Sequence, residues 1–412
     1  MSLQVGGSVD PEVILARAFL SRVAEPASAV VWGFVDQVGP VQAASAIRAG
    51  SAPAPVVSLT RARRDHVDPE GDLDTAERHG IRLVVPESEH WPQFALSALE
   101  RVARATDARC EARASVPAGR DGGDPVPPLA LWVKGSGDLL AVGVRSVAIV
   151  GARAATAYGE HVTAELAYGL AQREVLVVSG GAYGIDASAH RSALAAGRPT
   201  MVVCAGGLDR PYPAGNASLF ERAADGGLLV SESPPGSTPQ RHRFLTRNRL
   251  IAAFSTGTLV VEAAARSGAA NTAAHATRMG RPVMAVPGPI TSAMSAGCHA
   301  LLARDHDRAL LVTSVDDVIA VVGSMGEGIL AKRVVGPTDA RAELDALDPV
   351  ARRVFDGLSV RRPARPEEIA QRSGLSPLEV IRALPGLDLA GLLETCEGGY
   401  RIAARLRRDA RR

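Results

Sequence analysis

The chain has 412 residues, of which 46% are hydrophobic and 22% charged, and its formal net charge is +2. This composition is typical of an ordinary soluble protein, and the length is sufficient for two or three domains with sizeable cores. No apolar run reaches the roughly 18 residues of a membrane span, and the N-terminus lacks the basic and apolar regions of a signal peptide, so we expect a cytoplasmic protein without membrane contact.

Cysteine and histidine spacing argues against several kinds of site. The four cysteines form no CxxC pair, and the nine histidines show no HxH or HxxxH pattern, so we predict neither a disulfide framework nor a metal site. The chain also lacks a GxxxxGK[ST] phosphate loop and a GxSxG nucleophile. We therefore assign no catalytic residue, metal or cofactor.

The first 128 residues divide into two parts. Residues 11–50 carry apolar side chains at helical spacing, with breaks at Pro26 and at Gly39-Pro40, and predict a small helical module, to which we assign residues 1–101. Residues 102–128 lose this periodicity and gather Arg, Asp, Gly and Pro, which is typical of a linker or a loop insertion.

Residues 129–322 alternate short apolar runs with alanine-rich helical segments. The seven runs expected to form strands lie at residues 147–150, 175–178, 200–204, 228–231, 258–261, 283–286 and 310–312. Short apolar runs bounded by turn residues are typical of strands buried on both faces of a parallel sheet. This pattern predicts an α/β fold with a doubly wound, mainly parallel sheet between two layers of helices.

Glycine loops follow the first two of these strands. Gly151 ends the first strand, and Gly180, Gly181 and Gly184 follow the second. Both loops let backbone N–H groups approach an anion such as a phosphate at the start of a helix, although any doubly wound sheet needs tight turns at these points. Because ligands of open α/β sheets lie beyond the carboxyl ends of the strands, where both loops project, the pair favours a binding site.

An arginine-rich stretch lies in the second half of this domain. Between Glu232 and Asp305 the only acidic residue is Glu262. The eight arginines of this stretch are Arg241, Arg243, Arg247, Arg249, Arg266, Arg278, Arg281 and Arg304. Eight cations and one anion give a charge of +7, which favours binding of nucleic acid or another polyphosphate over a merely solvated face.

Two features keep catalysis open. Asp186 and His190 lie four residues apart on one predicted helix, where a carboxylate can orient an imidazole, but Asp186 also stands where a helix N-cap is expected, and we favour that structural role. Residues 256–262, TGTLVVE, are similar to the PGGxGTxxE signature of nucleotide phosphoribohydrolases, in which the glutamate serves catalysis. A serine and a threonine replace the glycine pair of that signature, which weakens an enzyme role for Glu262.

The C-terminal part predicts a second domain. Residues 323–345 are polar and glycine-bearing, a predicted linker, and residues 406–412 form a basic tail. Between them, residues 346–405 predict three helices, the third with a capping box at Ser376 and Glu379, and then a hairpin, which together make a winged helix. Its recognition helix offers only Glu379 and Arg382 as charged side chains, so contact with a protein is at least as good an interpretation as DNA reading.

Six segments together resemble the DNA-processing protein A (DprA, or Smf) family. They are VAIVGARAATAYG (147–159), SGGAYGIDASAHRSAL (179–194), GGLDRPYPAGNASLF (206–220), SESPPGSTPQRHRFLTRNRLIAAFS (231–255), VVEAAARSGAANTA (260–273) and GRPVMAVPG (280–288). The resemblance implies a Rossmann-like, dimeric protein that binds single-stranded DNA and helps load the RecA recombinase onto it, notably during natural transformation. The predicted helical module, as a SAM-like module, and the winged helix fit the family's usual layout.

The same motifs imply which residues contact the strand. They are Gly151, Arg153, Ser179, Gly180, Gly181, Ala182, Tyr183, Gly184, Arg243, Arg247, Asn248, Arg249 and Gly268. The chain departs from the family's pattern at Tyr183, where a cation is usual, although a tyrosine there can stack on a base. It also departs in FLTRNR and SGAANT, where FPxRNR and SGSLIT are usual. Because only 4% of residues are aromatic, we expect affinity to rest on backbone amides and arginines more than on stacking, and to fall steeply with salt.

Three functions are compatible with these patterns. The leading hypothesis is a non-enzymatic, homodimeric protein that binds single-stranded DNA and mediates recombinase loading. The second is a nucleotide-cleaving enzyme that uses Glu262. The third is a transcription regulator that binds duplex DNA through the winged helix, and the sparsely charged recognition helix makes it the weakest.

Overall fold

The computed structural model describes residues 9–112, 123–265, 267–303, 309–323, 344, 347–359, 362–396, 398–403 and 406. Backbone contacts divide the chain into two compact units, Met1–Ala331 and Lys332–Arg412, which are described separately. Most of the linker predicted at 323–345 and of the tail predicted at 406–412 lies outside the described residues, as do Arg266 and Arg304 of the arginine-rich stretch.

A nine-stranded sheet forms the centre of the first unit in the described part of the chain. Its order is β1-β2-β6-β5-β4-β3-β7-β8-β9, and all neighbours from β6 to β9 are parallel. The parallel strands are β3 (Ser146–Val150), β4 (Leu176–Ser179), β5 (Thr200–Val203), β6 (Leu228–Ser231), β7 (Gly257–Val260), β8 (Val283–Ala285) and β9 (Leu310–Leu311). Each overlaps one predicted strand, and the doubly wound, mainly parallel sheet is confirmed.

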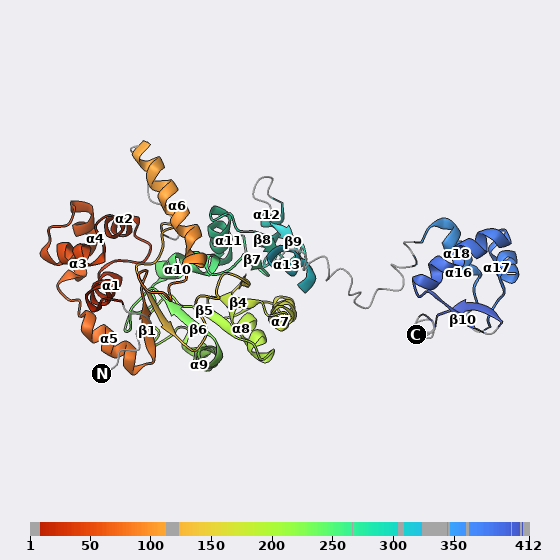
Figure 1. Cartoon of the computed structure of the whole chain (residues 1–412), viewed down its shortest axis with the longest axis horizontal. Helices are drawn as coiled ribbons and strands as arrows, with labels where there is room; N and C mark the ends of the chain where they lie inside the picture. The colour runs from red at the N-terminus through yellow and green to blue at the C-terminus, as the bar shows by residue number, and fades with distance from the viewer. Residues whose placement is uncertain are drawn as a thin grey trace. The chain divides into compact units, whose positions relative to one another are not determined.

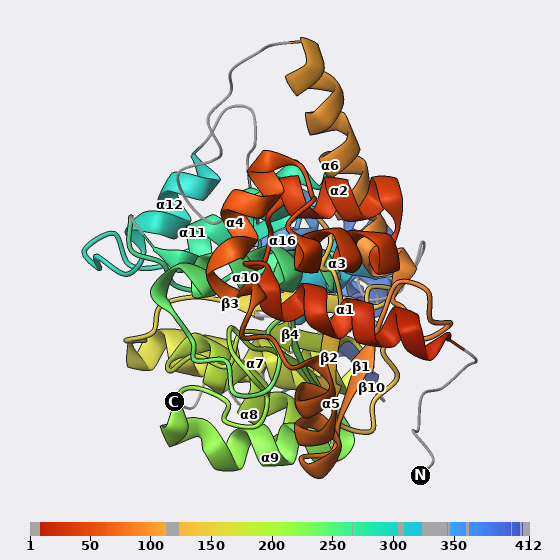
Figure 2. The ribbon, with the colours of Figure 1, turned by 90° about the vertical axis from the view of Figure 1, so that its left-hand side faces the viewer.

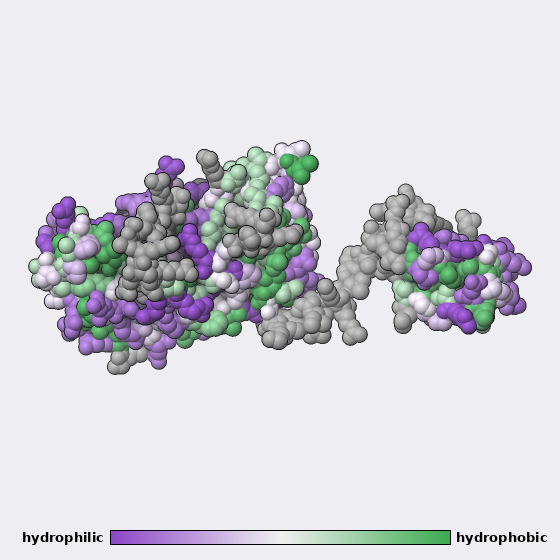
Figure 3. All heavy atoms as spheres, turned by 90° about the horizontal axis from the view of Figure 1, so that it is seen from above, coloured by the Kyte–Doolittle hydropathy of each residue, from purple (hydrophilic) through white to green (hydrophobic). Residues whose placement is uncertain are grey.

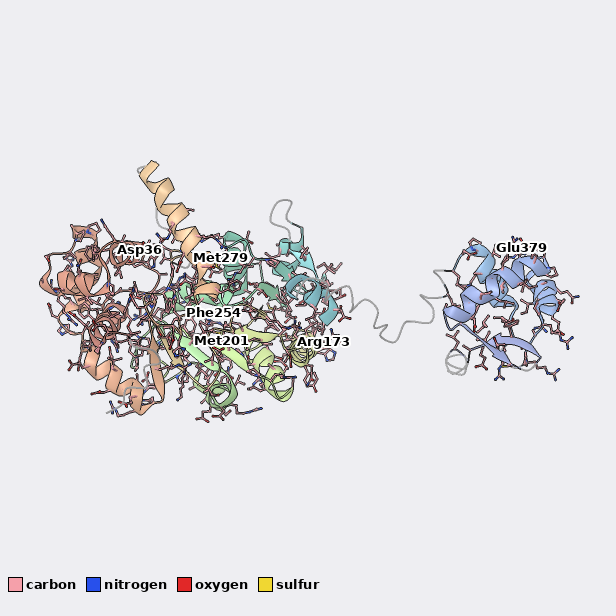
Figure 4. All side chains as sticks on the ribbon, viewed as in Figure 1. Asp36, Arg173, Met201, Phe254, Met279 and Glu379 are labelled. Carbon is pink, nitrogen blue, oxygen red and sulfur yellow. The ribbon has the colours of Figure 1, made fainter. Side chains whose placement is uncertain are left out.

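Helices cover both faces of this sheet (Figure 1). One face carries α7 (Ala157–Gln172), α8 (Ile185–Ala195), α9 (Ala217–Gly226) and α13 (Val315–Val322), and the other carries α6 (Gln93–Ala112), α10 (Arg241–Ala253), α11 (Gly268–Arg278) and α12 (Ala296–Leu302). Successive side chains of a strand serve opposite faces. Ile149 therefore shares a core cluster with Leu170 of α7, whereas Ala148 belongs to the cluster of Met201 and Phe254 (Figure 4).

Two strands were not predicted. β1 (Ile81–Val84) pairs antiparallel with β2 (Leu131–Lys134), which pairs antiparallel with β6. A run of four residues is too short to show a period of two, and β1 follows a region of helical spacing. The segment predicted as a linker from residue 102 also begins as helix, because α6 continues to Ala112.

From residue 9, where the described structure begins, five short helices precede β1. They are α1 (Pro11–Val23), α2 (Ala29–Val38), α3 (Pro40–Ala49), α4 (Ala54–Arg64) and α5 (Pro69–Arg78). Capping side chains start several of them: Asp10 accepts from a backbone N–H of α1, and Ser28 from one of α2. Buried Phe19, Leu20 and Ile47 belong to the common core of α1 to α4. In Figure 2 these helices face the viewer, near β1.

The second unit is the predicted winged helix. It contains α16 (Pro349–Gly357), α17 (Pro366–Ser373), α18 (Pro377–Leu389) and the hairpin of β10 (Leu393–Cys396) and β11 (Gly399–Ile402). The predicted capping box is present, since the Ser376 N–H donates to Glu379 Oε2 at 2.8 Å (Figure 4 labels Glu379). α18 runs beyond the predicted end near residue 384, through Pro385, to Leu389.

Among the described helices, none is both long and apolar enough to cross a membrane. On the face of the first unit seen in Figure 3, hydrophobic patches are interrupted by hydrophilic residues.

Candidate functional site

The centre of the sheet is a topological switch point. From β3 the chain continues on one side to β4, β5 and β6, and it later returns to the other side of β3 with β7. Ligands of such sheets bind beyond the carboxyl ends of the strands at this point. A cavity of about 700 Å³ lies there, lined by the loop after β3 and by residues of α10 and α11.

The two predicted glycine loops lock against each other at this edge. The Ala152 carbonyl accepts from the Ile185 N–H at 3.2 Å. Gly184 has a φ of +75°, and a Cβ there would lie 2.3 Å from the Ala152 oxygen. A Cβ on Gly151 would come within 2.6 Å of Ile185. Glycine is therefore required at both positions for the loops to approach so closely.

Arg247 is the best-placed cation of the cavity. It lines the cavity although only 6% of its surface is exposed. Its Nη1 donates to the carbonyl oxygens of Gly180, at 2.8 Å, and Val203. Its Nε has no hydrogen-bond partner among the described residues. Burial lowers the pKa of this guanidinium, whereas the charge of Asp186 raises it. The cavity wall therefore holds a buried cation whose Nε is unpaired among the described residues.

Asp186 does not play the predicted capping role. The N-cap of α8 is Gly184, and Asp186 lies inside the first turn. Its Oδ2 accepts instead from the Ala182 N–H at 3.4 Å. The N-cap of α8 lies two residues earlier in the chain than predicted. The Asp186 carboxylate therefore accepts a hydrogen bond from the glycine loop instead of capping the helix. Burial raises the pKa of Asp186, and the charge of Arg247 opposes this shift.

His190 has a partner of its own at the start of β5. Its Nδ1 lies 2.7 Å from the Thr200 Oγ1. Burial, together with the charges of Arg247 and Arg191, lowers the pKa of His190 to about 3. The imidazole is thus neutral at physiological pH, and the structure gives no acid–base pair of Asp186 and His190.

Aromatic side chains at the cavity were missed by the sequence prediction. The Arg153 guanidinium lies over the ring of Phe244, 5.1 Å from its centroid. Phe244 in turn meets Tyr212 edge-to-face, with centroids 5.8 Å apart. All three residues line the cavity. The low overall aromatic content hid this local concentration, and the signal that was present is the pair of motif segments RPYP and FLTRNR.

Two arginines of the implied site do not reach the cavity. Arg249 is 0% exposed, and its Nη1 and Nη2 donate to the two carboxylate oxygens of Glu232 at 2.5 and 2.6 Å. Arg243 donates from Nε and Nη2 to Glu25, at 3.1 and 2.8 Å. Both guanidinium groups are therefore paired with carboxylates and lie outside the cavity lining, and their assignment to the strand-binding surface stays a prediction. Arg241 lines the cavity instead.

The Glu25 carboxylate joins the N-terminal helices to α10. Besides Arg243 it contacts Arg63 of α4, and its Oε2 lies 3.2 Å from His242 Nε2. Burial alone would raise the pKa of Glu25, but hydrogen bonds from Arg243 and His242 and the charges of Arg243 and Arg63 lower it to about 2. One carboxylate thus holds the first turn of α10 against the N-terminal module.

The remaining implied residues fall into two groups. Gly151, Ala182, Asn248 and Gly268 line the cavity, and Ser267 caps α11 beside it. Ser179, Gly180, Gly181, Tyr183 and Gly184 shape the second glycine loop without lining the cavity. The Ser179 hydroxyl, for example, is buried and donates to the Ile149 carbonyl oxygen at 2.6 Å.

Glu262 is bound within the protein. It is 2% exposed, its Oε1 accepts from the Thr156 hydroxyl at 2.6 Å, and its Oε2 accepts from the Thr156 N–H at 3.0 Å. It does not line the cavity. This carboxylate therefore fastens the start of α7, and the site offers no support for a catalytic glutamate. In the described ranges, no cluster of three or more His, Cys, Asp or Glu residues is arranged to hold a metal ion.

Comparison with known proteins agrees with this architecture. Residues 122–323 match the family model of DNA recombination-mediator protein A, and residues 338–399 match that of the DprA winged helix domain. The putative DNA processing protein DprA of Mycobacterium tuberculosis is 48% identical over 394 residues, which cover 96% of this chain and 95% of that protein. Protein Smf of Escherichia coli is 36% identical over 282 residues, 68% of this chain and 72% of that protein.

A solved structure supports the same assignment. The X-ray structure of DNA processing protein A from Streptococcus pneumoniae is similar with a TM-score of 0.59 and 28% sequence identity, and the match covers 76% of this chain and 99% of that one. Because the mycobacterial similarity extends over nearly the whole of both proteins, the chain belongs to the DNA processing protein A (DprA/Smf) family.

Proposed function

We propose that this chain binds single-stranded DNA in the cavity at the sheet edge and delivers it to the RecA recombinase without cutting it. The observation that carries this proposal is the charge of the cavity. Among the described residues that line it, Arg153, Arg241 and Arg247 are cations and Asp186 alone is an acid. Such an excess of arginine suits the phosphates of a nucleic acid.

Helix ends add to this attraction. The first turns of α10 and α11 line the cavity, through Arg241 and Gly268. Free backbone N–H groups and the helix dipole make such ends favourable for anions. Phosphate contacts carry no base information, so binding is expected to tolerate any sequence. A flexible strand can enter a cavity of about 700 Å³ more readily than a stiff duplex can, which favours single-stranded DNA as the ligand.

An oligonucleotide-binding experiment tests the proposal. Fluorescence anisotropy with an unstructured 20-nucleotide strand, about the length of one or two such sites, is expected to show tighter binding than with the matching duplex. Arg153→Ala is expected to weaken binding about fivefold and to lower the salt slope by about 0.7, the value for one phosphate on a single strand. Arg222→Ala is the control, because this exposed arginine lies on α9, outside the cavity.

The outcome that contradicts the proposal is equal binding of strand and duplex at low salt, or no binding at all. A nucleotide-cleaving function has no comparable support, since Thr156 occupies both oxygens of Glu262. Release of free base from nucleoside monophosphates, and its loss in Glu262→Gln, would reverse this preference.

The protein partners belong to the same proposal. Delivery to RecA, in the cytoplasm, is tested by recombinase filament assembly on DNA coated with single-strand-binding protein, where addition of this chain should shorten the lag. The winged helix suits a protein contact better than duplex reading, because Glu379 is engaged in the cap of α18 while Leu378 and Ile381 are 57% and 51% exposed.

A homodimer completes the proposed assembly. Within the described residues β9 pairs only with β8, and its Leu310 and Leu311 are 48% and 58% exposed. An apolar edge strand is a ready surface for a second copy. Light scattering should report twice the mass of one chain, and Leu311→Arg should shift it towards the monomer. A monomer at micromolar concentration would contradict this part.

A further inference from the structure

Two half-exposed tyrosines lie beside the cavity and take no part in the phosphate contacts proposed above. Tyr183 follows β4 and is 51% exposed, and Tyr212 follows β5 and is 53% exposed. Both strands end at the edge that carries the cavity. Leaving a large aromatic face in water forgoes the free energy of its burial, so two such faces at one edge indicate a contact surface.

The structure holds both rings in place. Asn216 is 4% exposed, and its Nδ2 donates to the carbonyl oxygens of Gly181, at 3.0 Å, and Ala182, at 3.4 Å, which ties the two loops together. Tyr183 lies across Gly215, where a Cβ would come within 2.5 Å of the tyrosine hydroxyl oxygen and 3.3 Å of Cζ. A ligand that contacts these rings therefore costs little side-chain entropy.

The Tyr212 ring packs against a second aromatic ring, that of Phe244. Its ring meets that of Phe244 at an interplanar angle of 63°, and the Arg153 guanidinium lies over Phe244. Tyr212 and Ala182 line the cavity, and Tyr183 is the next residue after Ala182. The cations and Tyr212 thus line the cavity, and Tyr183 lies outside that lining, next to Ala182 in the chain and against Gly215.

This arrangement of cations and aromatic rings fits a single strand, which carries phosphates on its backbone and flat bases beside them. A strand whose phosphates occupy the arginine-lined cavity must place its bases elsewhere, and every base has a flat face that can stack on an aromatic ring. We propose that Tyr183 and Tyr212 form a stacking platform for bases of the strand bound in the cavity. The inference rests on the proposed function, and it adds an uncharged contact to a charged one.

The platform has a distinct salt signature. With a 20-nucleotide thymidine strand as probe, Tyr183→Ala in the full chain should weaken binding roughly 5- to 150-fold, the range for one stacked base, and leave the salt slope unchanged. Tyr183→Phe keeps the ring and should bind as the wild type does. Tyr183→Lys should steepen the slope by about 0.7. The control is Tyr168→Ala, since this tyrosine is 46% exposed on α7, away from the cavity lining.

An abasic strand of the same length separates the two proposals. Wild-type protein should bind it more weakly than the thymidine strand, and Tyr183→Ala and Tyr212→Ala should each narrow that difference. If the wild type binds neither strand, the proposed function fails. If it binds both equally, or if both alanine variants bind thymidine as the wild type does, the platform is wrong while DNA binding stands. Melting temperatures of the variants check their folding.

Discussion

The two sides of α10 use the same residue type for different purposes. On the cavity side, Arg247 keeps an Nε without a partner in the described structure. On the opposite side, Arg249 is bound by the Glu232 carboxylate, and Arg243, one turn before Arg247, is bound by the Glu25 carboxylate. All three belong to one 13-residue helix.

This difference shows that burial alone does not decide whether an arginine serves binding. Arg247 and Arg249 are both largely buried, at 6% and 0% exposure. What separates them is the hydrogen-bonded partner: Arg249 has a bidentate carboxylate, whereas Arg247 donates to neutral carbonyl oxygens and interacts with Asp186 through charge. A guanidinium with a carboxylate on its fork has little left to offer a phosphate.

The largest expected effect is on the core side. Arg249→Met leaves Glu232 buried without its cation, and the free energy of unfolding should fall by about 3–5 kcal/mol. Denaturant unfolding followed by circular dichroism measures this. The double variant Arg249→Met/Glu232→Leu removes the stranded charge and should regain part of the loss. If the free energy of unfolding of the single variant falls by less than about 1 kcal/mol, the Arg249–Glu232 pair contributes little to stability.

The next effect is on the cavity side. Arg247→Met should weaken binding of the single strand by about 10- to 150-fold, the range for a hydrogen bond to a charged group, and lower the salt slope by about 0.7. Its effect on unfolding should be smaller than that of Arg249→Met, because Arg247 donates to neutral carbonyl oxygens and acts on the Asp186 carboxylate through its charge, without a hydrogen bond between them in the described structure. Anisotropy and unfolding are measured on the same samples. If Arg247→Met binds the single strand as tightly as the wild type does, Arg247 does not serve binding, and it does not differ from Arg249 in this respect.

The smallest effect is at the Glu25 cluster, and it depends on pH. The pKa of Glu25 is lowered from 4.5 to about 2, so its ionised form stabilises the fold above pH 4.5, and this contribution is lost as the pH falls to about 2. Because the carboxylate is partly exposed, Glu25→Gln should cost only about 1 kcal/mol at pH 7. The melting temperatures of the wild type and of Glu25→Gln should converge as the pH falls through this range. A difference that stays constant would exclude an ionic contribution from Glu25.

The sequence predicted the sheet well and the site in part. Runs such as 147–150 are β-branched and bounded by glycine, so β3 and the loops beyond it could be placed from local pattern alone. Arg153 and Arg247 followed from the family motifs. The charge count, however, was taken between Glu232 and Asp305, and it left out the two acids that neutralise Arg249 and Arg243. Glu25 lies 218 residues from Arg243, a distance at which no local pattern indicates a pair.

The aromatic residues that line the cavity were not predicted, for a similar reason. A composition of 4% says nothing about where the rings gather, and Tyr212 and Phe244 meet only because separate loops reach one edge of the sheet. Tyr183 was interpreted from its position in a motif as a missing cation whose ring could stack on a base. The structure places that ring against Gly215.

The antiparallel strands at the end of the sheet affect how the molecule unfolds. β1 follows the five N-terminal helices in the chain yet pairs with β2, whose Trp132 is fully buried. The helices cannot detach without breaking this pairing and opening an edge of the main sheet. They should therefore melt together with the parallel strands in one cooperative transition, and a chain shortened to begin after β1 should aggregate through the exposed edge of β2.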